Sequence, residues 1–402
     1  MCYDIGAVFC RPIYIVRLTM NEKEVGEIRR HTRRDRSNMT ALYGCFVNDN
    51  QEIISQFRLS TGMMSENEGE KYFALMKRSL SGTLGKNLVD ITFRTSQVAD
   101  SPEHKLLMTL RESQLKDEEA LQSFYEKVIG SVHMDSSYLI LIGCDSYDVP
   151  FKAKDDSVQN DAGGETYRYL LCGICPVKQT KPALQYVAQE KTFHDGGISQ
   201  ILSAPVLGFL FPAFDNRSTN IYNALMYSKD VKDSHEEFVT AIFNVQPPMA
   251  AQAQRQSFQA LLTETLGDEC SLDVVQAVHS EISQMIQMHK ESKVDEPLML
   301  GKEQVKAVLT SSGISEEKMA KFNVDYDSTF GFEAELHPKN VIDQKHFEIT
   351  TPDVVIKVNP ERADLIETRV IGGVKYIMIC ADESVEVNGV GIQIQEREYA
   401  AP

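Results

Sequence analysis

Four polar residues are of the types found in hydrolytic sites. Two of them follow one apolar run typical of a buried strand, and the other two follow a second such run. They are Asp145, Asp148, Asp215 and Arg217. Carboxylates at the end of a strand can bind a divalent cation or serve as general acid and base. If the two strand ends lie together, the sequence predicts a metal-assisted hydrolase. The alternative is that these aspartates only cap loops.

Five arginines form the densest basic cluster of the chain: Arg29, Arg30, Arg33, Arg34 and Arg36. On a helix, the first four would form two adjacent rows, because residues four apart are neighbours on the helix surface. Such a surface could contact phosphates with an affinity that falls as salt rises. The alternative is a solvated helix end, whose positive charges match the helix dipole and pair with acidic neighbours.

Cys172 and Cys175 form a CxxC pair, the spacing of redox sites and of half a zinc site. The pair lies in an apolar run that reads as a strand, and no second pair completes a zinc site. Residues three apart in a strand point to opposite faces. The sequence therefore predicts two buried structural cysteines, and we expect no metal and no cofactor.

Other motifs also fall short of a known chemistry. The glycines of the SGTLGK segment are too close together for a phosphate loop, and the HEEFV segment lacks the second histidine of a zinc protease. No serine lies in a GxSxG context. The absence of these motifs argues against an enzyme but does not decide the question.

The composition is that of a globular protein of two or three domains: 402 residues, 42% hydrophobic and 25% charged. The formal charge of −17 disfavours nonspecific attraction to nucleic acid or anionic lipid, but leaves room for a local basic patch. No apolar run approaches the roughly 20 residues of a membrane helix. Scattered cysteines without a disulfide framework favour a cytoplasmic location.

The helices and strands expected along the chain predict an α+β protein. We expect a mixed α+β domain over 20–245, a helical middle segment over 250–330 and a small β domain over 338–396. Residues 1–19 are expected to be a start-site artefact before Met20, or a disordered tail. In the first domain, helices are expected at 21–34, 65–80, 102–112, 117–129 and 236–244. Strands are expected there at 41–48, 52–59, 88–93, 138–144, 167–177, 206–211 and 221–227.

The rest of the chain changes from helical to alternating periodicity. Helices are expected at 250–266, 271–290, 302–310 and 315–322. Strands are expected at 347–350, 354–358, 366–371, 374–380 and 385–387, with tight turns at Gly372-Gly373 and Asn388-Gly389.

Several long segments resemble a known bacterial family, the domain of unknown function 4317. They include LSGTLGKNLVDI, YLILIGCDSYDVPF, YLLCGICPVK and LGFLFPAFDNRSTNIYNALMY. The resemblance begins at Met20 and covers nearly all of the remaining chain. It implies a bacterial, cytoplasmic protein and brings no catalytic residues, because none are established for that family.

A fainter similarity links the C-terminal part to the 37 kDa nucleoid-associated protein family. The stretch that carries it is HFEITTPDVVIKVNPERADLIETRVIGGVKYIMI, a pattern of strands and turns. The similarity would imply a role near the chromosome.

The sequence favours a non-enzymatic binding or regulatory protein that is nucleoid-associated, with nucleic acid bound through the arginine cluster. One alternative is a metal-assisted hydrolase using Asp145, Asp148 and Asp215. Another is an assembly module in which the helix at 271–290 pairs between subunits of a homo-oligomer. No membrane partner is expected.

Overall fold

The structure of the protein is a computed structural model that describes residues 20–152, 158–159, 165–292, 294, 296–332, 334–381 and 385–393. The expected start-site artefact or disordered tail at 1–19 lies outside the described residues, as does most of 153–164. The chain separates into two compact units that divide at Ala250, and each is described by itself. Helices and antiparallel sheets occur together, which confirms the α+β class.

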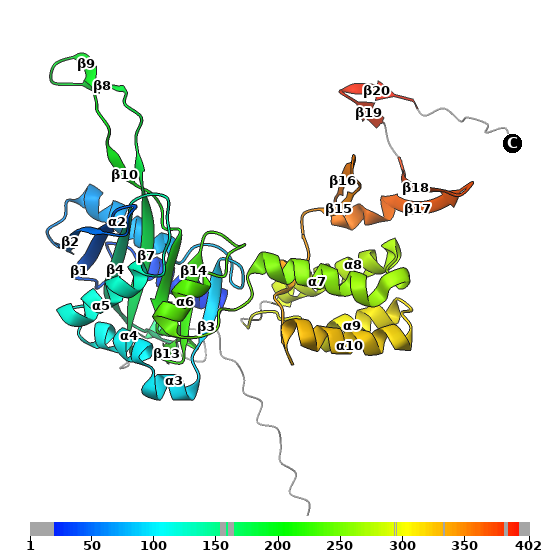
Figure 1. Cartoon of the computed structure of the whole chain (residues 1–402), viewed down its shortest axis with the longest axis horizontal. Helices are drawn as coiled ribbons and strands as arrows, with labels where there is room; N and C mark the ends of the chain where they lie inside the picture. Colours follow the sequence, from blue (N-terminus) through cyan, green and yellow to red (C-terminus); the bar gives the residue numbers. More distant parts are fainter. Residues whose placement is uncertain are drawn as a thin grey trace, which may run out of the picture. The chain divides into compact units, whose positions relative to one another are not determined.

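The first unit is built on an antiparallel sheet, and its described strands lie in the order β2-β1-β4-β7-β11-β14-β3, with β10 paired to β7 (Figure 1). The strands are β1 (Ala41–Val47), β2 (Ile53–Ser60), β3 (Leu88–Thr92), β4 (Tyr138–Asp148), β7 (Thr166–Gln179), β10 (Gln200–Leu202), β11 (Leu207–Phe211) and β14 (Asn223–Ser228). The expected strands are therefore present, with shifted ends.

Helices cover both faces of this sheet. On one face lie α1 (Glu22–His31) and α2 (Glu66–Arg78), and their apolar side chains pack with Leu139 and Leu141 of β4. On the other face lie α4 (Pro102–Glu112), α5 (Glu118–Ile129) and α6 (Glu236–Phe243), packed on Ile140 and Ile142. The short α3 (Thr95–Asp100) precedes α4. Alternate residues of the central strands thus enter different hydrophobic cores.

The ends of the helices follow from their capping residues. Asn21 and Glu24 form a capping box at the start of α1, and Ser65 and Asp117 accept backbone hydrogen bonds at the starts of α2 and α5. The expected helix at 21–34 is wrong at its C-terminal end, because α1 ends at His31. Both the backbone N–H and the hydroxyl of Thr32 donate to the Ile28 carbonyl, which closes the last turn.

The two central strands are longer than expected. β4 continues to Asp148, opposite Thr166 of β7, whereas the sequence predicted a strand that ends at Cys144. Asp145 and Asp148 therefore lie in a strand rather than in a loop after it. Continued pairing with β7 extends the strand, and such a partner is not visible in a local pattern.

The two cysteines of the CxxC pair point to opposite faces of β7, as expected. Cys172 belongs to the core beneath α4–α6, and Cys175 belongs to the core beneath α1 and α2. Burial raises the pKa of the Cys175 thiol to about 12, so it stays protonated. Both are free cysteines in the interior, which confirms the expected burial.

A hairpin that the sequence did not reveal stands away from the rest of the first unit. It consists of β8 (Leu184–Val187) and β9 (Thr192–Asp195), and β10 connects it back to the sheet (Figure 1). Two smaller hairpins are β5 (Phe151–Lys152) with β6 (Val158–Gln159), and β12 (Ala213–Asp215) with β13 (Ser218–Asn220).

The second unit has a helical core. Its elements are α7 (Ala251–Leu266), η1 (Gly267–Glu269), α8 (Leu272–Ser292), α9 (Lys302–Ser311), α10 (Glu316–Phe330) and α11 (Pro338–Val341). The row Val274, Val278, Ile282 and Ile286 of α8 is buried against the other helices. Among the described residues, no helix combines the length and hydrophobicity that crossing a bilayer requires.

The C-terminal part forms separate two-stranded hairpins in the described residues. They are β15 (Phe347–Thr350) with β16 (Val355–Val358), β17 (Ile366–Ile371) with β18 (Val374–Ile379), and β19 (Val385–Val387) with β20 (Val390–Ile392). The short η2 (Pro360–Leu365) lies between the first two hairpins and contacts α8 through Gln276, whose side chain donates to the Ala363 carbonyl.

Candidate functional site

Asp145 holds the turn after α1 against the sheet. Its carboxylate accepts hydrogen bonds from the Ser37 hydroxyl at 2.7 Å, from the Asn38 backbone N–H at 2.9 Å and from the Tyr169 hydroxyl at 3.0 Å. The residue is only 2% exposed, and His31 Nε2 lies 3.5 Å from the same carboxylate. These donors occupy the oxygen atoms that a metal ion or a substrate would need.

Asp148 has a different environment three residues further along β4. Its side chain is exposed and, among the described residues, accepts a hydrogen bond from the Thr166 hydroxyl at 2.8 Å. Since residues three apart in a strand point to opposite faces, the two aspartates do not face a common point.

Asp215 and Arg217 lie on the β12–β13 hairpin, which packs against α1. Asp215 is 5% exposed and accepts a hydrogen bond from the Asn220 amide at 2.9 Å. The Arg217 guanidinium donates to the Pro150 carbonyl at 2.9 Å and pairs with Glu27 at 3.1 Å. Asn216 and Arg217 both adopt positive φ, at 53° and 58°, so they form the tight turn of this hairpin.

One face of α1 links these residues into a row. Glu27 accepts from the Tyr147 hydroxyl at 2.7 Å and pairs with Arg217, while the His31 ring lies 4.6 Å from the Tyr147 ring. His31 in turn contacts Asp145. The structure therefore connects Asp145 to Arg217 through other side chains, and no direct contact joins Asp145 to Asp215 among the described interactions.

A further carboxylate on the sheet, Asp90, was missed by the sequence reasoning. Asp90 lies in β3, and its Oδ1 is buried without a hydrogen-bond partner. Burial, with a smaller contribution from the charge of Asp215, raises the pKa of Asp90 to about 7. Burial also raises the pKa of Glu24 and of Asp215. An aspartate within the apolar run 88–93 was the signal that could have revealed it.

These acids do not form a metal centre as they stand. Within the part of the chain that the structure describes, no group of three histidine, cysteine, aspartate or glutamate side chains is placed to hold a metal ion. A metal-assisted reaction at Asp145, Asp148 and Asp215 would therefore require these side chains to move together.

The arginine cluster is divided by the end of α1. Arg29 and Arg30 lie on the helix, whereas Arg33, Arg34 and Arg36 lie in the turn after it, so the two expected helical rows are wrong. Arg34 donates to the Met64 carbonyl at 3.1 Å and lies over Gly69 of α2. Arg30, Arg33 and Arg36 are exposed.

The turn and α2 enclose a hollow of about 690 Å³. It is lined by Thr32, Arg33, Arg34, Asp35, Glu66, Glu70, Phe73, Ala74 and Lys77. The acidic and basic side chains are equal in number there. Asp35 pairs with Arg33 at 3.1 Å and approaches Arg36 at 3.9 Å, but these pairs are exposed and contribute little to stability. The exposed arginines on its rim remain available to a ligand.

Ser228, His235 and Asp233 have the order of a catalytic triad, a relation that the sequence reasoning also missed. The Ser228 hydroxyl lies 2.8 Å from His235 Nε2, and His235 Nδ1 lies 3.3 Å from the Asp233 carboxylate. However, Ser228 is 3% exposed and donates to the Asp230 carbonyl at 2.6 Å, while the Asp233 side chain is 59% exposed. The contacts close the loop before α6 and do not present a nucleophile.

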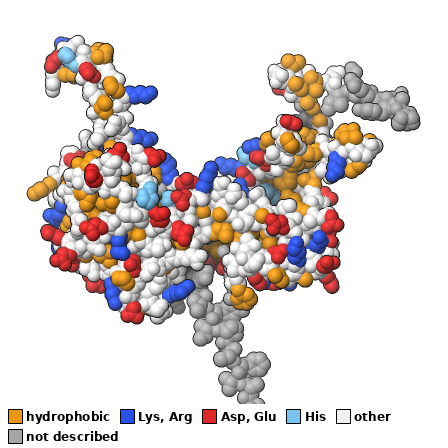
Figure 2. Space-filling model, viewed as in Figure 1, with side chains coloured by type: hydrophobic (Ala, Val, Ile, Leu, Met, Phe, Trp, Pro, Cys, Tyr) orange, Lys and Arg blue, Asp and Glu red, His pale blue; other side chains and the backbone are white. Residues whose placement is uncertain are grey.

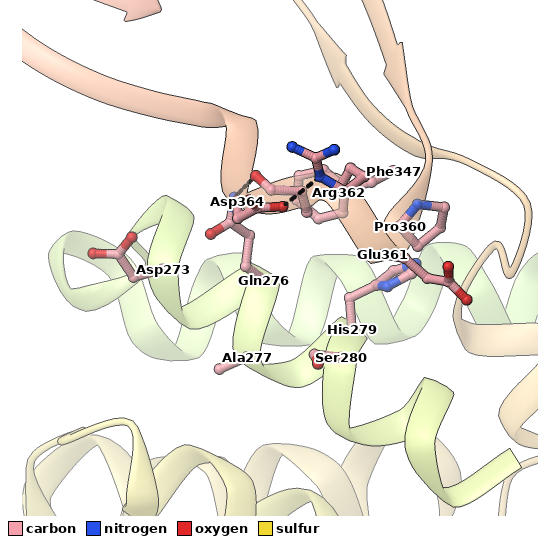
Figure 3. Close-up of a pocket in the computed structure, with 11 residues that line it drawn as sticks. Asp273, Gln276, Ala277, His279, Ser280, Phe347, Pro360, Glu361, Arg362 and Asp364 are labelled. Atoms are coloured by element: carbon pink, nitrogen blue, oxygen red, sulfur yellow. Dashed lines mark hydrogen bonds and ion pairs between the residues drawn. The ribbon is translucent and has the colours of Figure 1, made fainter. Parts of the chain in front are cut away.

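The second unit has a hollow of about 530 Å³ between α8 and η2 (Figure 3). His279 Nε2 donates to the Asp343 carbonyl at 2.8 Å, and its ring lies edge-on to Phe347. On the η2 side, Arg362 lies 3.5 Å from Asp364 (Figure 3). The charged side chains point along the rim, and none is held in a reactive arrangement.

A family model described as a domain of unknown function, DUF4317, matches residues 20–390. The chain belongs to this family. No curated protein and no solved structure matches it. Membership in the DUF4317 family brings no activity with it, and the similarity to the 37 kDa nucleoid-associated protein family gains no support.

Asp145→Asn should destabilise the protein strongly, by about 2–4 kcal/mol, because an amide group would face the buried donors that now bind a carboxylate. Asp148→Asn is the matched control, since its remaining carbonyl oxygen can still accept from Thr166, and we expect a change of less than about 0.5 kcal/mol. Urea unfolding measures both. Equal effects at the two positions would contradict the anchoring role of Asp145.

Asp90→Asn should stabilise the protein at high pH. The folded-state pKa of Asp90 is raised to about 7, so the folded wild type loses stability as pH rises from about 4 to 7, whereas the variant does not. We expect the free energy of unfolding to rise by about 1–3 kcal/mol at pH 8 and to change little below pH 4. This gain is smaller than the full pKa shift would give, because Asp90 keeps some exposed surface. Thermal unfolding against pH tests this, with exposed Asp49→Asn as the control.

Proposed function

We propose that this protein is a non-enzymatic binding protein with a regulatory role, which contacts the phosphates of nucleic acid through Arg30, Arg33 and Arg36. The observation that supports this most directly is that these three side chains stay exposed while Arg34 is held by Met64. Guanidinium groups bind phosphate oxygens with two parallel hydrogen bonds.

The electrostatics restrict the mode of contact. The net charge of −17 repels a polyanion, and Glu66 and Glu70 line the hollow beside the arginines. Contact would therefore be limited to the exposed arginines in the last turn of α1 and in the turn after it. Two or three phosphate contacts give a weak affinity with a logarithmic salt slope of about −2 to −3. A bacterial cytoplasmic, nucleoid-associated location is part of this proposal.

The double variant Arg33→Glu/Arg36→Glu should lower the affinity for duplex DNA at least about tenfold and reduce the salt slope by about 2, because two phosphate contacts are lost. Fluorescence anisotropy over a series of salt concentrations measures both quantities. Lys229→Glu/Lys232→Glu makes the same change in net charge on exposed residues outside the cluster and should have a much smaller effect. Binding that is independent of salt, or equally weakened by both double variants, would exclude the arginine surface.

The alternative of a metal-assisted hydrolase using Asp145, Asp148 and Asp215, with Arg217 nearby, depends on a rearrangement of these groups. It predicts that Mg²⁺, Mn²⁺ or Ca²⁺ raises the thermal unfolding temperature, and that Asp148→Ala removes the shift. Asp148 suits this test because its exposed carboxylate, among the described residues, accepts a hydrogen bond only from the Thr166 hydroxyl. An unfolding temperature unaffected by all three ions would argue against the alternative.

The alternative is an assembly module that pairs through α8, but little of the apolar surface of this helix is exposed. The main apolar row of that helix is buried within its own unit, which leaves Val275 and Met288 exposed at 38% and 58%. A homo-oligomer through α8 would depend on these two side chains, and Val275→Glu/Met288→Glu would then abolish it in sedimentation experiments.

A further inference from the structure

The β17–β18 hairpin has free strand edges and exposed apolar side chains. Among the described strands, β17 and β18 pair only with each other. Val370 is 68% exposed and Ile379 is 56% exposed, and Figure 2 shows hydrophobic side chains, in orange, at the surface of the C-terminal hairpins. An isolated two-stranded hairpin is marginally stable in water, and a free flat edge is a template for another strand.

The two faces of this hairpin differ in chemistry. Ile366, Thr368 and Val370 alternate along one face of β17, opposite Ile379, Ile377 and Lys375 of β18. Glu367 and Arg369 lie on the other face, where they pair at 2.8 Å. Met378, Tyr376 and the pair Ile371–Val374 share that face with them, so apolar side chains lie on both faces and the opposite charges of β17 lie on one.

The backbone pairing decides which groups point away from β18. The two-residue turn Gly372-Gly373 makes Ile371 and Val374 a hydrogen-bonded pair, and the Cys380 N–H donates to the Leu365 carbonyl at 2.7 Å. Since bonded and non-bonded pairs alternate in an antiparallel ladder, the odd-numbered residues of β17 bond to β18. The backbone groups of Ile366, Thr368 and Val370 point to the free edge.

The free edge of β17 is complementary to itself. If two copies pair antiparallel about a two-fold axis at Thr368, the two Thr368 residues form a hydrogen-bonded pair. Ile366 of each copy then lies opposite Val370 of the other on the apolar face. Glu367 of each copy lies opposite Arg369 of the other on the second face. Such Thr–Thr, apolar and opposite-charge pairs are the favourable cross-strand pairs of a sheet.

We propose that β17 pairs with β17 of a second copy of this chain, which creates a four-stranded sheet in the order β18-β17-β17-β18. The same surface is used by both copies, as a closed two-fold dimer requires. The pairing satisfies the outward backbone groups of Thr368 and joins two apolar faces into one larger face.

The other free edges are less suited to self-pairing. On the edge of β18, a two-fold axis at Ile377 would place Lys375 opposite Ile379, and no opposite charges would meet. Lysine on an edge strand is also a common device against pairing. The interface at β17 is small compared with the roughly 800 Å² per partner of stable complexes, so we expect a reversible dimer whose population depends on concentration.

Sedimentation equilibrium of the full chain tests the proposal. The mass should rise with concentration from 45.2 kDa toward that of a dimer. Glu367→Arg alone makes two positive charges meet at Arg369 of the other copy, and Arg369→Glu alone makes two negative charges meet at Glu367 of the other copy. Each variant should weaken self-association at least about tenfold, because like charges then lie opposite one another across the strands. An equimolar mixture of the two variants should associate again as a heterodimer.

The mixture is informative because each single variant keeps its own like-charge pair within β17. Recovery in the mixture can therefore come only from contacts between copies. A mass of 45.2 kDa at all concentrations would overturn the proposal. So would a wild-type dimer that both variants preserve, or a mixture that stays monomeric.

A backbone variant gives an independent measurement. Thr368→Pro removes an N–H that points to the free edge, so it should block dimerisation while leaving the bonds to β18 in place. Lys375→Pro removes an outward N–H from the opposite edge and should leave the dimer intact. Equal loss of association in both proline variants, with unchanged circular dichroism, would also contradict the proposed edge.

Discussion

The sheet of the first unit is covered by helices on both faces, and this constraint decides where its polar side chains can lie. Every residue of β14, from Asn223 to Ser228, is buried, and so is every residue of β11. In such a layer a side chain must be apolar, or it must find partners within the protein. Asp145 meets this requirement with several donors. Asp90 does not, since its Oδ1 has no hydrogen-bond partner among the described residues, and burial raises its pKa to about 7.

The same constraint connects the sheet to the arginine surface. Ser37 and Asn38 both bind Asp145, and they directly follow the turn that carries Arg33 and Arg36. The Ser37 backbone N–H also donates to the Arg33 carbonyl at 2.8 Å. The position of the exposed arginines therefore depends on a buried carboxylate in β4. A change at Asp145 would alter the arginine surface without touching any of its side chains.

The α+β class and most elements could be predicted from the sequence, because their signals are local. The near-continuous apolar runs of β4 and β7, the capping box of Asn21 and the opposite directions of Cys172 and Cys175 all follow from nearby residues. The roles of the site residues could not be predicted, because they depend on distant partners. Asp145 binds residues 107 and 108 positions away, and Arg217 binds Glu24, 193 positions away.

The end of α1 shows how a local pattern can mislead. The basic residues after His31 continue a helical pattern, yet Thr32 turns its hydroxyl back to the Ile28 carbonyl and the chain leaves the helix there. Thr32 is completely buried, so this turn is set by packing against the sheet as well as by hydrogen bonding. Threonine competes with the helix for backbone groups, and tertiary contact decided the outcome.

The C-terminal hairpins differ from the sheet of the first unit, because many of their apolar side chains are exposed. Their alternation was visible in the sequence, but alternation places apolar side chains on one face without saying what covers that face. In β15–β16 the apolar face, with Phe347 and Ile349, is partly buried, and Phe347 contacts His279 of α8. In β17–β18 most of the apolar side chains stay exposed. The proposed pairing of two β17 edges satisfies outward backbone groups and matches opposite charges, but it enlarges this apolar face without covering it.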